Sequence, residues 1–175
     1  MRELLDPSEY QLAVRSVFEG VSGELTRLVP GARIEHVGAS SIPGAISKGD
    51  LDICVVVAAR DHSAAVQVLE ASGYLVKGDT LRTPELCMLQ SPRSDVDVAL
   101  QVVAEGSEFE FFMRFRDALR ADPNLVERYN QLKYEFASSG AERYRNEKAK
   151  FIESVLRACD AQQFNAERTG AGAGR

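Results

Sequence analysis

Apolar positions near the start of the chain recur every three or four residues, which predicts a long amphipathic helix that ends at Val29. The segment Asp6-Pro7-Ser8 supplies a capping side chain and a proline suited to the first helical turn. The pair Pro30-Gly31 then stops the helix. The apolar positions of the repeat are Leu12, Val14, Val17, Phe18, Val21, Leu25 and Leu28.

Three further stretches carry strand patterns. Residues 33–37 predict a short strand that enters GASSIPGAISKGD, a glycine- and serine-rich segment typical of a loop or one short helical turn. Residues 51–57 are almost continuously apolar and β-branched, which indicates a central buried strand. Residues 95–103 alternate between two faces. One face carries Val96, Val98, Leu100 and Val102, and the other carries Asp95, Asp97, Ala99 and Gln101.

The remaining pattern is mostly helical. An amphipathic helix is expected at 61–72, with short strands at 74–76 and 85–90. Further helices are expected from 108 to about 121, after Asp122-Pro123, and over about 141–161. The sequence thus predicts an α/β (α+β) fold, with a small mixed β-sheet over about 31–104 flanked by helices and a helical half over about 108–162. We expect one domain over 1–162 and a disordered tail over 163–175, which has no apolar period.

Length and composition fit one globular domain. The chain has 175 residues, of which 45% are hydrophobic, and its net charge is −5. An acidic pI of about 5.2 argues against broad affinity for nucleic acid or anionic membranes. The three cysteines are odd in number and widely spaced, so they indicate neither a disulfide framework nor a zinc site. Because no signal peptide or membrane-length segment is present, we expect a cytoplasmic protein, either a monomer or a small homo-oligomer.

The feature that points to chemistry is Asp50-Leu51-Asp52, which opens the apolar strand directly after the glycine- and serine-rich segment. Residues two apart in a strand face the same way, so the two carboxylates converge and repel each other unless a proton or a cation compensates them. Mg²⁺ prefers oxygen ligands and binds one or two carboxylates together with water and phosphate oxygens. Small residues at 38–41 allow backbone N–H groups to approach a phosphate. The acidic pair alone, or the small residues alone, would be typical of an ordinary turn, but together they indicate a metal-bound polyphosphate.

This arrangement resembles the nucleotidyltransferase superfamily, which carries a Gly-Ser turn followed about a dozen residues later by an acidic-hydrophobic-acidic strand. Gly38 precedes Asp50 and Asp52 at that spacing. More narrowly, residues 36–53, HVGASSIPGAISKGDLDI, resemble the GrpB family signature HVGSTSVPGLAAKPxIDI. The segments FRDALRADPNLVERYNQLKYEFA and ERYRNEKAKFIESVL extend the resemblance over about 33–158.

The resemblance implies roles for the carboxylates. Asp50 and Asp52 would ligate Mg²⁺, or Mn²⁺ in its place, and a third carboxylate would come from a neighbouring strand. Asp97 is our candidate for this third ligand and for activation of the acceptor, because it lies on the polar face of the strand predicted at 95–103. Asp95 is the alternative, and a solvated surface charge is the other interpretation of Asp97.

The resemblance also implies that Gly38, Ser40 and Ser41 line a turn that holds the triphosphate. The chain departs from the superfamily pattern here, because Ala39 stands where a serine is usual. A second departure lies in the strand predicted at 95–103, where two histidines of the family pattern fall on Ala99 and Gln101.

Five further residues are candidates for binding the nucleotide: His36, Arg116, Arg120, Lys133 and Lys148. His36 ends the first strand beside the turn, although a lone histidine is more often structural. Arg116 and Arg120 share one face of a helix, where they would either clamp phosphates or pair with acidic neighbours. The two lysines match lysines of the family pattern, yet exposed helical lysines are common.

We therefore expect a metal-dependent nucleotidyltransferase that moves a nucleoside monophosphate from a nucleoside triphosphate to an unidentified acceptor. The partners would be that nucleotide and that acceptor, with no membrane and no long nucleic acid. The alternative is a module that binds a nucleotide or phosphometabolite without turnover, which the missing Gly-Ser hydroxyl favours. The absence of GxxxxGK[ST] argues against a kinase of the P-loop type.

Overall fold

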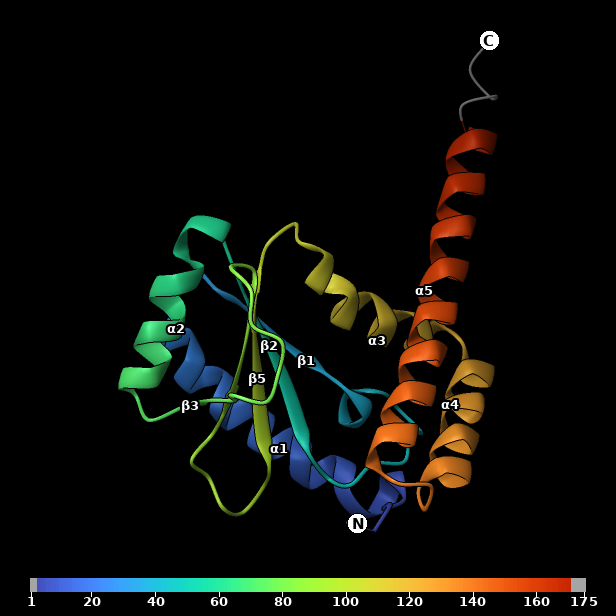
Figure 1. The fold of residues 1–175 in the computed structure, drawn as a ribbon, viewed down its shortest axis with the longest axis horizontal. Coiled ribbons are helices and arrows are strands. Elements are labelled where there is room, and N and C mark those ends of the chain that lie inside the picture. The colour runs from blue at the N-terminus through green and yellow to red at the C-terminus, as the bar shows by residue number, and fades with distance from the viewer. Residues whose placement is uncertain (1–2, 171–175) are drawn as a thin grey trace.

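A five-stranded mixed sheet forms the centre of the computed structural model, which describes residues 3–170 (Figure 1). The strands lie in the order β1-β2-β5-β4-β3. β2 and β5 pair in parallel, and the other neighbouring strands pair antiparallel. The bounds are Arg33–Val37 for β1, Leu51–Val57 for β2, Leu75–Val76 for β3, Leu86–Gln90 for β4 and Val98–Ala104 for β5.

One face of the sheet is covered by α1 (Pro7–Leu28) and α2 (His62–Ala71). Side chains of the two central strands alternate between the faces, so Ile53 of β2 and Leu100 of β5 are fully buried under these helices. They join Leu25 of α1 in one apolar cluster. Removal of this apolar surface from water is the main force that holds the two helices on the sheet.

The opposite face carries α3 (Phe111–Ala121), which follows a short 3-10 turn, η3 (Glu108–Glu110). Met113 of α3 packs there against Cys54 and Val103. α3 also packs against α4 (Pro123–Phe136) and α5 (Ala141–Gly170), and the three helices meet at an aromatic cluster. That cluster consists of Phe115, Tyr129 and Phe151. The helical half therefore holds α4 and α5 beside the sheet (Figure 1).

The structure confirms the predicted fold class and the strands at 33–37 and 51–57. The strand predicted at 95–103 is shifted, because β5 begins at Val98. Its neighbour β4 ends at Gln90, opposite Ala99, so residues 95–97 lie beyond the paired part of that ladder.

The C-terminal helix is longer than the sequence predicts. Disorder is expected from residue 163, whereas α5 continues to Gly170 and projects past the other helices (Figure 1). Half of residues 163–170, namely the glutamine, alanine, glutamate and arginine, are good helix formers, which allows the helix to propagate without an apolar stripe. Residues 171–175 of the predicted tail lie outside the described residues. Within residues 3–170, none of the helices combines the length and the apolarity needed to cross a bilayer.

Candidate functional site

A cleft of about 140 Å³ opens where β2 begins, between the sheet and helices α4 and α5. Both acidic residues of the Asp50-Leu51-Asp52 motif line it, and so do both candidate lysines. The full lining is Leu4, Ala39, Ser47, Lys48, Asp50, Asp52, Tyr129, Lys133, Tyr144 and Lys148. The structure thus brings together four predicted site residues that are up to about a hundred positions apart in the chain.

Gly38 and Asp52 approach each other where β1 ends and β2 begins. The register pairs Val37 with Asp52, so the residue after Val37 lies directly beside the carboxylate. Gly38 adopts φ +69°, and a Cβ added there would lie 2.3 Å from Asp52 Oδ2. A side chain at position 38 would therefore clash with Asp52 and would also strain the backbone. The glycine of the signature is required by this close approach.

Asp50 is held in place by the loop before β2. Ser47 Oγ donates a hydrogen bond of 2.8 Å to Asp50 Oδ1, and the backbone N–H of Gly49 donates one of 3.2 Å to the same Ser47 oxygen. Ser47 is buried and lines the cleft, although no pattern in the sequence distinguishes it from the other serines of the segment. Asp50 is therefore positioned before any ligand arrives.

The carboxyl group of Asp52 is in an unusual electrostatic environment. Its burial and the negative charge of Asp50 raise the pKa of Asp52 to about 6, against the opposing effect of Lys148. Gln101 on β5 donates a hydrogen bond of 3.1 Å from Nε2 to Asp52 Oδ1, which also favours the ionised form. The two carboxylates therefore repel each other in one cleft, as their spacing predicts.

Gln101 is a residue of the site that sequence reasoning missed. Its side chain is only 5% exposed, and its Oε1 atom is buried without a hydrogen-bond partner in the described structure. The available signal was its place on the polar face of the strand predicted at 95–103, where the family pattern has a histidine. A neutral amide therefore contacts Asp52 from the neighbouring strand, instead of a third carboxylate.

The two candidate third carboxylates lie elsewhere. Asp97 does not line the cleft, and its Oδ1 accepts a hydrogen bond of 2.6 Å from Gln90 Nε2 on β4. Asp95 forms a 2.6 Å ion pair with Arg93 at the surface. Within residues 3–170, no three histidine, cysteine or acidic side chains gather as a metal site. The roles of Asp95 and Asp97 stay predictions, and this geometry does not favour them.

The two candidate lysines of the cleft, Lys133 and Lys148, differ in their electrostatics. Lys133 is only 2% exposed; its Nζ donates to the carbonyl of Ile46 and lies 4.0 Å from the centre of the Tyr129 ring. Burial, and then the charge of Lys148, lower the pKa of Lys133 to about 7. By contrast, the pKa of Lys148 is raised by the nearby Tyr129, Asp52, Tyr144 and Asp50, whose combined effect outweighs the opposing effect of burial. Lys148 is thus the permanent cation that faces the two carboxylates.

Only one residue of the turn after β1 lines the cleft. The turn forms a short 3-10 helix, η1 (Ala39–Ser41), of which Ala39 lines the cleft. Ser40 and Ser41 do not line the cleft; Ser40 Oγ lies 3.0 Å from His36 Nε2, and Ser41 Oγ donates a 2.7 Å hydrogen bond to the carbonyl of Gly38. The side chains of His36, Ser40 and Ser41 therefore do not join the carboxylates, although the sequence predicts that they share one site.

The two candidate arginines also lie outside the cleft. Arg116 forms ion pairs of 2.6 Å with Glu35 and 2.7 Å with Asp117, which matches the alternative interpretation as acidic pairing. It also donates to the carbonyl of His36, at 3.0 Å. Arg120 donates two hydrogen bonds, of 3.0 and 2.8 Å, to the carbonyl of Ser41. Both arginines fix the position of β1 and η1 against α3.

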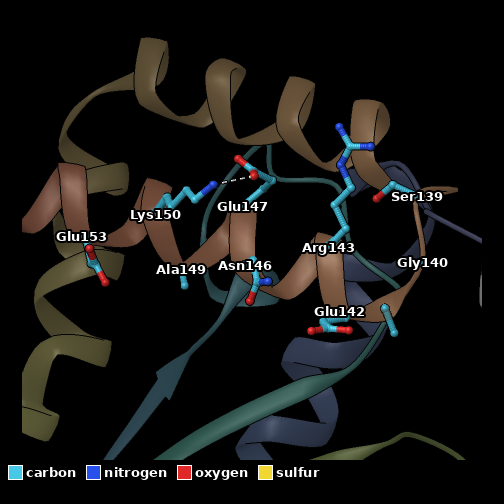
Figure 2. A pocket seen from close by; sticks show the side chains of 10 residues that line it. Ser139, Gly140, Glu142, Arg143, Asn146, Glu147, Ala149, Lys150 and Glu153 are labelled. Atoms are coloured by element: carbon cyan, nitrogen blue, oxygen red, sulfur yellow. Dashed lines mark hydrogen bonds and ion pairs between the residues drawn. The ribbon is translucent and has the colours of Figure 1, made fainter.

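A second hollow, of about 660 Å³, lies at the start of α5 and contains no predicted site residue (Figure 2). Lys150 and Glu147 pair with each other across 2.8 Å, and Arg143 lies over the ring of Phe136 on α4. Its charged side chains thus have partners or point to solvent, as Figure 2 shows for Glu142. The cleft at Asp50 and Asp52 is the better candidate site.

The sequence model of the family described as GrpB protein matches residues 7–158. The chain belongs to the GrpB family. A UPF0157 protein of Vibrio cholerae is 52% identical over 148 residues, which are 85% of this chain and 78% of that relative. The crystal structure of GrpB from Enterococcus faecalis superposes with a TM-score of 0.72 at 20% identity, over 89% of this chain and 98% of that one.

The fold is also similar to that of a nucleotidyltransferase. The Cid1 poly(U) polymerase with bound MgGTP superposes with a TM-score of 0.51 at 15% identity. The match covers 70% of this GrpB chain but only 41% of Cid1, so most of the polymerase has no counterpart here. At this identity the likeness establishes a nucleotidyltransferase-like fold and nothing about activity.

Proposed function

We propose that this GrpB protein is a metal-dependent nucleotidyltransferase, which transfers a nucleoside monophosphate from a nucleoside triphosphate to an acceptor. The observation that carries the proposal is the convergence of Asp50 and Asp52 in one cleft beside Gly38, on a nucleotidyltransferase-like fold. The acceptor is not identified by the residues of the cleft.

The oxygen atoms of the cleft fit a divalent cation. Two neighbouring carboxylates repel each other, and the raised pKa of Asp52 reflects that repulsion together with burial. Asp50 and Asp52 would hold Mg²⁺, or Mn²⁺ in its place, since Mg²⁺ commonly takes one or two carboxylates and completes its shell with water and phosphate oxygens. When bound, the cation neutralises charge on the transferring phosphoryl group and on the pyrophosphate that leaves.

The lysines would bind the phosphate chain. Lys148 carries its charge permanently and lies near both carboxylates, so it would compensate the oxygens of a triphosphate held there. Lys133 is buried with a pKa of about 7, so an arriving phosphate would favour its charged form. Gly38 keeps the Asp52 carboxylate close to the backbone of the turn, and Ser47 orients Asp50.

A nucleotide-binding module without turnover is the second candidate. It is favoured by Gln101, which places a neutral amide, and not a third carboxylate, against Asp52 from the neighbouring strand. Ala39 in the cleft adds to this, because it offers no hydroxyl to a phosphate. Such a module would bind the metal and nucleotide but would release no pyrophosphate.

Calorimetry with ATP or GTP in the presence of Mg²⁺ tests the site that both functions share. The parent protein should bind, and Asp52→Asn should lose most of the Mg²⁺-dependent affinity. Asp160→Asn is the matched control, since the same change is made to an exposed carboxylate that pairs with Arg114 outside the cleft. Equal binding by the parent and Asp52→Asn would show that the cleft is not a metal–nucleotide site.

Pyrophosphate release separates the two functions. A coupled phosphate assay with candidate acceptors should detect Mg²⁺-dependent release by the parent and by Asp160→Asn, and none by Asp52→Asn. Nucleotide binding without release, across protein, small-molecule and RNA-end acceptors, would instead support the binding module.

A further inference from the structure

A groove of about 860 Å³ lies between α1, η1 and the end of α3, separate from the cleft. The two hollows share the turn η1, because Ala39 lines the cleft whereas Ser40 and Ser41 line the groove. His36 and Arg120 line the groove as well. Four residues that the sequence assigns to the nucleotide therefore line the groove and not the cleft.

Arg120 supplies an oriented cation to this groove. Its Nε and Nη2 both donate to the carbonyl of Ser41, at 3.0 and 2.8 Å, which fixes the plane of the guanidinium. The residue is exposed, and within residues 3–170 neither an ion pair nor a hydrogen bond of its Nη1 is found. Burial of part of the side chain and the nearby charge of Arg116 lower the pKa of Arg120, against the opposing effects of Asp117 and Glu35. An anion that reached Nη1 would give this nitrogen a partner.

The other charges of the groove do not cancel Arg120. Arg15 and Glu19 both line it, and they face each other across 3.8 Å one helical turn apart. The pKa of His36 is lowered to about 4 by burial and by the charges of Arg120, Arg116 and Arg15, so the imidazole is neutral at pH 7. The groove therefore keeps a net positive charge, which is centred on Arg120.

The remaining wall is apolar and aromatic. Phe18 stacks on His36 with ring centres 4.8 Å apart and an angle of 21° between the planes. Leu12 lies on the same side of α1 and is 81% exposed, which leaves a large apolar side chain in water. Pro43 also lines the groove. A flat or aliphatic body would remove this surface from water and gain hydrophobic free energy.

We propose that this groove binds a small organic anion, whose carboxylate or phosphate group contacts Arg120 and whose apolar body lies against Leu12 and Phe18. The site is distinct from the cleft at Asp50 and Asp52, and it does not depend on the proposed nucleotidyl transfer. The ligand class follows from one exposed guanidinium that forms no ion pair within residues 3–170, beside an exposed apolar wall.

The chain has two histidines, which makes imidazole NMR a direct test. His36 lines the groove, whereas His62 is buried outside it, with Nε2 3.0 Å from the carbonyl of Val102. Phenyl phosphate and phenylacetate should shift the His36 ring signals saturably at pH 7 and leave those of His62 in place. Because His36 is neutral at this pH, the shift reports binding and not protonation.

Three variants locate the contacts. Arg120→Gln retains a donor for the Ser41 carbonyl but should weaken phenyl phosphate binding by at least about tenfold, the loss expected for charge-assisted hydrogen bonds. Arg60→Gln is the matched control, since this arginine is 87% exposed and does not line the groove. Leu12→Ser should weaken phenyl phosphate but leave inorganic phosphate unchanged.

Several outcomes would overturn the proposal. A His36 signal that does not move would show that no anion binds there, and equal shifts of His36 and His62 would indicate a general effect. If the parent and a folded Arg120→Gln protein bound phenyl phosphate with equal affinity, Arg120 would not recognise the anion. If the parent bound benzyl alcohol as tightly as phenyl phosphate, the anionic group would not contribute to binding. Asp52→Asn should leave these shifts unchanged, so failure here is independent of failure at the nucleotide cleft.

Discussion

Replacement of Gly38 by alanine tests whether the close approach of the turn to Asp52 shapes the site. Gly38 has φ +69° and ψ −175°, a backbone region that costs a residue with a Cβ about 1–3 kcal/mol. The new methyl carbon would also lie 2.3 Å from Asp52 Oδ2 and 2.9 Å from its Cβ. Relief of such an overlap by movement of buried groups typically costs a further 1–3 kcal/mol or so. We expect Gly38→Ala to lower the free energy of unfolding by about 4 kcal/mol.

Gly31→Ala is the matched control, because Gly31 also has a positive φ, +85°, but a Cβ there would meet nothing within 4 Å. It should cost only the backbone contribution, about 1–2 kcal/mol. Urea unfolding followed by circular dichroism measures both losses, and with a typical slope the two midpoints should differ by about 1 M. In an Asp52→Ala background, which lacks the carboxylate, the loss of unfolding free energy caused by Gly38→Ala should be smaller by about 1 kcal/mol or more.

Equal losses for the two glycine variants would refute this reasoning, since they would show that contact with Asp52 adds nothing. The same conclusion would follow if Gly38→Ala cost as much in the Asp52→Ala background as in the parent. Nucleotide binding adds a functional readout: at temperatures where both variants are folded, only Gly38→Ala should lose Mg²⁺-dependent binding.

Three further predictions concern charge. The pKa of Asp52 is raised to about 6 by burial and Asp50, so between about pH 4 and 6 the folded chain keeps a proton that the unfolded chain has lost. In metal-free buffer the free energy of unfolding should therefore gain about 2 kcal/mol as pH falls through this window, and Asp52→Asn should lack that gain in urea titrations at each pH. Gln101→Glu adds an acidic group beside Asp52, so without a divalent cation the melting temperature of the variant should be lower than that of the parent. Mg²⁺ should then raise the melting temperature of the variant by more than it raises that of the parent. An unchanged response to Mg²⁺ would count against the cleft as a metal site. Arg116→Leu should cost about 3 kcal/mol in urea unfolding, because Arg116 is only 8% exposed and its loss leaves Glu35 with only the longer, 3.5 Å pair to Arg33. Arg114→Leu, which removes an exposed pair with Asp160, should cost under about 1 kcal/mol.

Local sequence patterns were sufficient to predict the elements that carry the site. The apolar run at 51–57 and the prolines and glycines around the helices predicted strand and helix positions that the structure confirms within a few residues, except for the end of α5. The convergence of Asp50 and Asp52 also followed from sequence, because residues two apart at the start of a strand share a face. Their separation from solvent, and the lysines from α4 and α5 that face them, required the helical half to pack beside the sheet.

Other parts of the site depended on contacts that local periodicity does not encode. Asp97 and Gln101 lie on the same predicted face of one strand, and the parallel register of β2 and β5 determines which of them reaches Asp52. Ser40 and Ser41 follow Ala39 directly, yet the single turn η1 directs them away from the cleft. Arg116 and Arg120 share a helix face as their spacing predicts, but that face meets β1 and η1.

The sequence by itself therefore determined the α/β elements, the acidic pair and the requirement for a small residue before it, because each depends on neighbours within a few positions. Only the tertiary structure decided that Gln101 contacts Asp52 and that the candidate nucleotide residues are divided between a cleft and a groove. The physical reason is that strand order, register and helix docking are set by burial of apolar surface from distant segments. The position of a polar side chain in the folded protein therefore depends on how distant apolar segments pack, and the neighbouring residues in the sequence do not determine it.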